Sequence, residues 1–132
     1  MALKDKKQTE KNHTFLQSLL HAWSGVVRIF KQERNMRIHI FLAVLAIIVA
    51  AVLQISRLEW YWIIACIGAV LITETFNTIA ENLVDLITEK NYSELGKHIK
   101  DMAAGAVLIC ALFSAFIGVC IFMPKIWNLI FH

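Results

Sequence analysis

Three long apolar runs restrict this chain of 132 residues to a helical membrane protein. They cover residues 38–55, 60–87 and 102–123. At about 1.5 Å per residue, even the shortest run spans roughly 27 Å as a helix, which is close to the hydrocarbon thickness of a bilayer. A hydrophobic content of 58% and a mean hydropathy of +0.62 also lie well above the values of ordinary soluble domains. One proline and five glycines argue against a barrel or a loop-rich fold.

The segment before the first run is amphipathic. Residues 14–32 place apolar side chains at helical spacing on one face, whereas the other face carries Gln17, Arg28 and Lys31. Such a helix, with tryptophan and basic flanks, tends to lie in the membrane interface. The expected fold is therefore an all-α integral membrane protein, a single domain with an N-terminal amphipathic surface helix and three transmembrane helices.

Polar residues predict where these helices end. Ser56–Glu59 predicts a very short turn, Thr88–Asp101 predicts a polar loop, and Pro124 predicts the end of the third span. Residues 1–13 are charged and are not followed by the apolar core of a signal peptide, so we expect a cytoplasmic tail there.

The positions of lysine and arginine predict the orientation of the chain. Eight of the 13 lie in residues 1–37 and three in the loop at 88–101, with one in the first turn and one near the C-terminus. Cytoplasmic segments carry the excess of basic residues, so the N-terminus and the second loop are predicted to be cytoplasmic and the C-terminus outside. The net charge of +3 is too small to argue for a nucleic-acid partner.

The cytoplasmic end of the second span carries an unusual polar stripe. At about 100° per residue, Glu74, Asn77, Glu81 and Asp85 fall at roughly 0°, −60°, −20° and +20° on the helical wheel, with Thr78 beside them. Carboxylates in or near a membrane are costly, and they face a cavity, a partner charge or a metal.

Three interpretations of the stripe compete. It could pair with the basic residues around Arg34, it could be the solvated end of a helix leaving the bilayer, or it could bind divalent cations. Ion pairing does not require Asn77 in line with the acids, and a solvated end explains Glu74 poorly because Glu74 directly follows the apolar run. Glu33, at the same membrane level, could complete a site for Mg²⁺, which prefers oxygen ligands and usually brings phosphates. Lys100 and its neighbours could meet such a phosphate.

Histidine and cysteine show no metal or catalytic pattern. Cys66, Cys110 and Cys120 lie in apolar runs without C-x-x-C spacing, which predicts small buried packing residues. The histidines are scattered and each fits a surface or interfacial position better than a ligand role; they are His13, His21, His39, His98 and His132. None of the loops typical of soluble kinases occurs.

Three motifs in order give a specific resemblance. They are E-x-x-N-x-x-x-E at 74–81, "VDLI" at 84–87 and "KDMAAGAVLI" at 100–109. Together with the surface helix and three spans, they resemble the prokaryotic diacylglycerol kinase family of small membrane kinases, over nearly the whole chain. "QERNMRIH" at 32–39 is similar to the undecaprenol kinase branch of that family.

The resemblance implies a homotrimer in the bacterial plasma membrane, with shared active sites near the cytoplasmic face. Each site would transfer the γ-phosphoryl group of Mg·ATP to a lipid hydroxyl. Glu74 matches the catalytic base, and Glu33 and Glu81 match the carboxylates that bind Mg²⁺. The positions that match the nucleotide-binding set are Gly25, Asn77, Asp85, Lys100 and Asp101.

Departures from the family pattern bear on the lipid. Thr14, Gln17 and Ala103–Ala104 stand where some diacylglycerol-using members carry other residues. The expected substrate is undecaprenol, with diacylglycerol as the alternative. Two other classes of protein would fit an acidic stripe: an ion pathway, although Trp60–Ile72 carries no Asp, Glu, Lys, Arg or His, and a non-catalytic assembly subunit.

Overall fold

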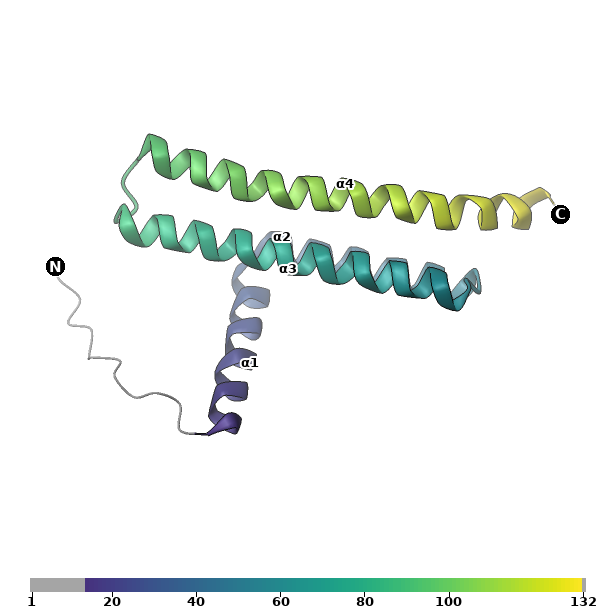
Figure 1. Cartoon of the computed structure of the whole chain (residues 1–132), viewed down its shortest axis with the longest axis horizontal. Helices are drawn as coiled ribbons and strands as arrows, with labels where there is room; N and C mark the ends of the chain where they lie inside the picture. Colours follow the sequence, from purple (N-terminus) through teal and green to yellow (C-terminus); the bar gives the residue numbers. More distant parts are fainter. Residues whose placement is uncertain (1–13, 132) are drawn as a thin grey trace.

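The computed structural model describes residues 14–131, which form four helices and no strand. The helices α2, α3 and α4 lie alongside one another in an elongated bundle, whereas α1 projects from its side (Figure 1). The three bundle helices are each long and apolar enough to cross a membrane, which confirms the predicted all-α fold class. The predicted tail at residues 1–13, His13 and His132 lie outside the described residues. The helices are α1 (Phe15–Gln32), α2 (Arg34–Val52), α3 (Arg57–Ile87) and α4 (Glu94–Phe131).

The bundle buries little apolar surface within one chain. α3 packs most extensively on α4 and less on α2. α1 packs mainly on α2. The core cluster consists of Ala50, Ile55, Ile63 and Ile121, all near the end of the bundle that holds the α2–α3 turn. Most other large apolar side chains of the bundle face outward, Phe116 among them. Such a surface is unfavourable in water and suits contact with lipid tails or with other membrane helices.

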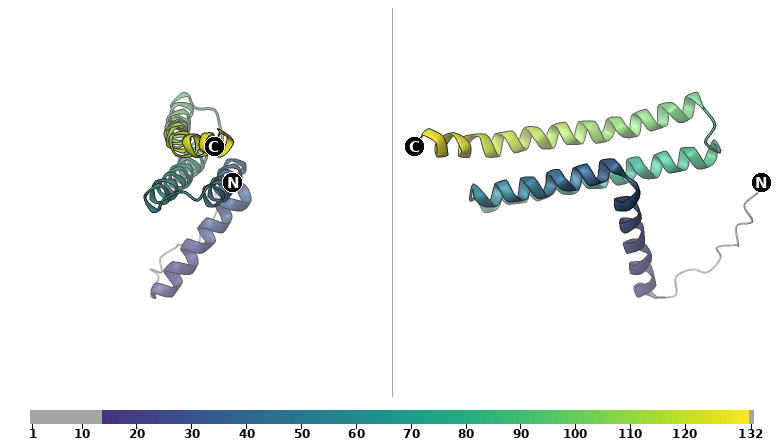
Figure 2. Two further views of the ribbon diagram at one scale, coloured as in Figure 1. Left: turned by 90° about the vertical axis from the view of Figure 1, so that its right-hand side faces the viewer. Right: turned by 180° about the vertical axis from the view of Figure 1, so that it is seen from behind.

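The surface helix α1 is fully separate from this core. The side chain of Thr14 caps α1 by accepting a hydrogen bond from the Gln17 N–H at 3.3 Å. Glu33 then takes an extended conformation, with φ −96° and ψ 119°, which turns the chain sharply between α1 and α2 (Figures 1 and 2). None of the residues of α1 is buried, and Trp23 remains exposed. An unburied apolar face is expected of a helix in the membrane interface.

The first two bundle helices differ from the predicted spans at their ends. α2 begins at Arg34 rather than at residue 38, and it ends at Val52 because Gln54 adopts a left-handed conformation with φ 48°. α3 begins at Arg57 rather than at residue 60, so most of the predicted turn at 56–59 is helical. The reason is a capping box. The Glu59 N–H donates to Ser56 Oγ at 3.3 Å, and Glu59 Oε2 accepts from the Ser56 N–H at 2.6 Å.

The last helix differs more from its predicted span. α4 starts at Glu94, so the predicted polar loop at 88–101 is helical in its second half. The side chain of Ser93 accepts a hydrogen bond from the Gly96 N–H at 3.2 Å and stabilises this earlier start. The predicted stop at Pro124 is wrong, because α4 continues through it to Phe131. A proline removes one backbone hydrogen bond, but in an apolar environment every other backbone group still needs its helical partner.

Candidate active site

The predicted polar stripe lies on α3 and is the most buried polar region among the described residues. The exposed fractions are 2% for Glu74, 5% for Asn77 and 4% for Thr78. Burying a carboxylate is costly unless a partner compensates its charge or a ligand uses it. The interpretation of the stripe as a solvated helix end is therefore wrong for Glu74, which has the largest fully buried side chain in residues 14–131.

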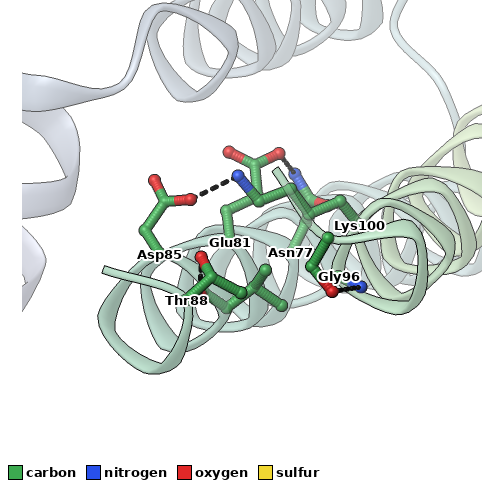
Figure 3. Close-up of polar contacts among 8 residues, drawn as sticks. Asn77, Glu81, Asp85, Thr88, Gly96 and Lys100 are labelled. Atoms are coloured by element: carbon green, nitrogen blue, oxygen red, sulfur yellow. Dashed lines mark hydrogen bonds and ion pairs between the residues drawn. The ribbon is translucent and has the colours of Figure 1, made fainter. Parts of the chain in front are cut away.

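Asn77 links two levels of the stripe. Its Nδ2 donates a hydrogen bond to Oε1 of Glu81 at 3.0 Å, one helical turn further along α3 (Figure 3). Within residues 14–131, neither Oδ1 of Asn77 nor Oγ1 of Thr78 has a hydrogen-bond partner, although both atoms are buried. Buried polar atoms are rarely left unpaired, so these two atoms mark the place where a ligand, an ion or water would be accommodated.

Asp85 and Lys100 join α3 to α4 at the end of the stripe. Lys100 Nζ donates to Asp85 Oδ1 at 2.5 Å (Figure 3). Both side chains remain more than a third exposed, so the ion pair itself adds little stability. Next to the pair, α3 and α4 border a cavity of about 380 Å³, whose charged lining residues are Asp85, Lys90, Lys97, Lys100 and Asp101. Three lysines around one cavity suit a polyanionic ligand such as a nucleotide phosphate chain.

The predicted metal ligands lie around Glu74. Glu33, at the junction of α1 and α2, and Glu81 of α3 are both close enough to interact electrostatically with Glu74. Across residues 14–131, however, no three His, Cys, Asp or Glu side chains are grouped as a complete metal cluster. Glu33 and Glu81 are oxygen ligands of the type that Mg²⁺ takes, an ion usually held by one or two carboxylates together with substrate phosphates and water. The unpaired Oδ1 of Asn77 is a further oxygen atom beside Glu81 that could act as a metal ligand.

His39 is part of the site and was missed by the sequence analysis, which assigned it a surface or interfacial position. Its Nε2 lies 3.9 Å from Oε2 of Glu74, and its side chain is only 19% exposed. The available signal was the position of His39 as an isolated polar group in the first apolar run. The sequence alone does not give the register of α2 against α3, so it could not place this side chain opposite Glu74.

The structure does not bring every predicted site residue to the site. Gly25 lies on α1, which projects away from the bundle (Figure 2), and a Cβ atom added to it would meet no atom within 4 Å. Within one chain, the structure therefore does not bring Gly25 to the cavity near Lys100. The three cysteines form no disulfide, and none is buried as predicted: Cys66 and Cys110 are partly buried, and Cys120 is exposed.

The order of these elements and motifs agrees with a known family. The family model of the prokaryotic diacylglycerol kinases matches residues 20–122, from α1 into α4. The chain belongs to this family. It is 39% identical over 112 residues to an undecaprenol kinase of Bacillus subtilis, covering 85% of this chain and 90% of that protein. It is 38% identical over 114 residues to a diacylglycerol kinase of Synechocystis, of which it covers 65%. A diacylglycerol kinase of Escherichia coli is 31% identical over 103 residues.

Membership confirms the resemblance and makes this membrane protein a lipid kinase. All of the acidic stripe and both residues of the Lys100–Asp101 pair fall inside the matched region. A lipid kinase must bring a water-soluble nucleotide to a hydroxyl group at the membrane surface. The stripe runs from the buried Glu74 to the partly exposed Asp85.

Proposed function

We propose that this prokaryotic diacylglycerol kinase family member transfers the γ-phosphoryl group of Mg·ATP to the hydroxyl of undecaprenol. The main support for this reaction is the position of Glu74, which is deeply buried at one end of the stripe. The other end of the stripe borders a lysine-lined cavity. The relative called undecaprenol kinase, which matches over 90% of its length, supports the choice of lipid. Diacylglycerol is the second candidate, since relatives of comparable identity are called diacylglycerol kinases.

In this proposal, Glu74 is the general base. It takes the proton of the lipid hydroxyl as the hydroxyl oxygen bonds to the γ-phosphorus, and the bond from that phosphorus to the bridging oxygen breaks to release ADP. A buried carboxylate is suited to this step because the apolar run before it keeps bulk water from competing with the lipid as acceptor.

The nucleotide would lie in the cavity at the ends of α3 and α4. Lys100, oriented by Asp85, would contact the phosphates, and Asp101 lies in the same lining. Asn77 does not line this cavity and would contact the nucleotide from the neighbouring part of the stripe. Glu33 and Glu81 would hold Mg²⁺. When bound, this ion neutralises charge on the phosphates during transfer.

The active enzyme in this proposal is a homotrimer with sites shared between subunits. Two observations support an assembly with shared sites: the exposed apolar faces of the bundle, and the open space around Gly25 on a helix that lies away from the cavity. The number of three subunits is taken from the family resemblance alone. A neighbouring subunit could bring Gly25 to the nucleotide. The N-terminus and the α3–α4 loop would face the cytoplasm, where ATP is available, and the C-terminus would lie outside.

The test is the transfer of labelled γ-phosphate from Mg·ATP to undecaprenol and, separately, to diacylglycerol by purified protein in mixed micelles. Glu74→Gln removes the base with little change in shape. Glu59→Gln is the matched control, because it is on the same helix about 22 Å away and glutamine preserves the capping box. We expect product from undecaprenol that is lost in Glu74→Gln and retained in Glu59→Gln. Product from diacylglycerol alone would overturn the choice of lipid, and no product from either lipid would refute the proposal.

A further inference from the structure

We infer that His39 binds the hydroxyl group of the acceptor lipid and holds it against the carboxylate of Glu74. This inference rests on the proposed function, because it assigns Glu74 the role of base. It adds a second residue, from a different helix, that decides whether a lipid alcohol reaches that base in a reactive position.

The distance between the two side chains fits a bridging oxygen. His39 Nε2 and Glu74 Oε2 are 3.9 Å apart, which is too long for a direct hydrogen bond. An oxygen atom at about 2.8 Å from each would fit between them, because two such distances exceed the gap. A hydroxyl group satisfies both neighbours at once: it donates its proton to the carboxylate and accepts a hydrogen bond from the ring N–H.

The cavity beside His39 suits the rest of a lipid alcohol. A cavity of about 290 Å³ lies between α2, α3 and α4, and His39 lines it. Almost all other lining side chains are apolar, Leu42, Ile67 and Phe122 among them. An alkyl or isoprenoid segment would be favourable there. Its terminal hydroxyl would then meet His39, which is the only ionisable side chain of the lining apart from the Cys66 thiol.

The other polar groups near Glu74 cannot replace His39. Glu33 and Glu81 are carboxylates, which accept but do not donate when ionised. Asn77, which donates one N–H of its amide to Glu81, does not line the 290 Å³ cavity. Thr78 is buried on the same helix face and does not line the 290 Å³ cavity. His39 is therefore the side chain that both borders the apolar cavity and can donate a hydrogen bond toward Glu74.

The experiment compares full-length wild-type protein with His39→Ala, His39→Gln and the control His21→Gln, whose exposed histidine lies on α1. Transfer to undecaprenol and to diacylglycerol is measured at varied lipid and ATP, together with ATP hydrolysis in the absence of lipid. We expect His39→Ala to lower kcat/KM for the lipid about 10- to 100-fold, the scale on which misplaced reactants lose rate. The KM for ATP and the lipid-free hydrolysis should remain as in wild type. Glutamine, whose amide can donate from a similar position, should restore much of the loss.

A lipid kcat/KM in His39→Ala equal to that of His21→Gln would overturn the inference. So would an equal loss of lipid transfer and lipid-free hydrolysis, because that pattern indicates a general structural defect. If His39→Ala does not fold, His39→Gln is compared with His39→Asn, whose shorter amide does not reach the position of Nε2. Equal activity of these two variants would also overturn it. A wild-type protein that phosphorylates neither lipid would instead refute the proposed function.

Discussion

Replacing Gly96 by alanine tests how closely α3 and α4 must approach beside the candidate active site. A Cβ atom at this position would lie 2.9 Å from Cγ1 of Val84, well inside the usual contact distance of about 3.5–4.0 Å between carbon atoms. Val84 is buried and β-branched, so its side chain has little freedom to rotate away. The two helices must therefore separate locally, one turn before Lys100.

The matched control is Gly105→Ala in the same helix, where an added Cβ would meet no atom within 4 Å. Gly105→Ala gains the helix-forming advantage of alanine over glycine, about 0.5–1 kcal/mol in a helix interior, and Gly96→Ala, in the first turn of α4, gains no more than this. Only Gly96→Ala adds an overpacking cost of about 1–3 kcal/mol. The free energy of unfolding of Gly96→Ala should therefore lie about 1–3 kcal/mol below that of Gly105→Ala.

The assay is equilibrium unfolding of the purified protein in mixed micelles, with lipid kinase activity measured in parallel. Gly96→Ala should also raise the KM for ATP, because the separation of α3 and α4 moves Lys100 relative to Asp85. Combining Gly96→Ala with Val84→Ala removes the clashing methyl group, so the two changes should be non-additive and the double variant should recover α3–α4 packing. Equal stability of Gly96→Ala and Gly105→Ala would refute the steric reasoning.

Three further changes test other parts of the structure. Glu81→Gln should raise the Mg²⁺ concentration for half-maximal activity by more than about tenfold, since even residues that only orient metal ligands have effects of that size; an unchanged Mg²⁺ titration would contradict its assignment. Lys100→Met should raise the KM for ATP about 10- to 100-fold, as expected for losing a charge-assisted contact, and adding Asp85→Asn should cause little further loss if the pair acts as a unit. Lys125→Gln breaks the 3.3 Å ion pair with Glu59 at the other end of α3. It should change the free energy of unfolding by less than about 1 kcal/mol and leave activity intact, and a larger effect in either assay would show that this end is coupled to the site.

Local properties of the sequence were sufficient for the fold class and for the polar stripe. Hydropathy over windows of spanning length identified the three membrane helices, because a bilayer imposes length and composition on each helix separately. The periodicity of one helix placed Glu74, Asn77, Glu81 and Asp85 on a single face, because positions on one helix are fixed by its own geometry. Family motifs then predicted a lipid kinase, and the match to the family confirmed it.

The helix ends were predicted less well, because the signals that set them are local but weak. Ser56 and Ser93 cap α3 and α4 earlier than the hydropathy profile suggested, and α4 passes through Pro124. Capping depends on single side-chain hydrogen bonds, whereas hydropathy averages over many residues. The consequence for the site is direct, since Lys100 and Asp101 lie on a helix and not in a flexible loop.

Contacts between helices were decided only by the tertiary structure. The sequence alone did not give the contacts that place His39 of α2 opposite Glu74, Lys100 on Asp85, or Gly96 against Val84. These pairings depend on the register and spacing of neighbouring helices, which are set by the fit of many side chains along their whole length. The sequence by itself determined that a row of acids would enter the membrane on one helix face, and packing of the helices decided which partners those acids meet.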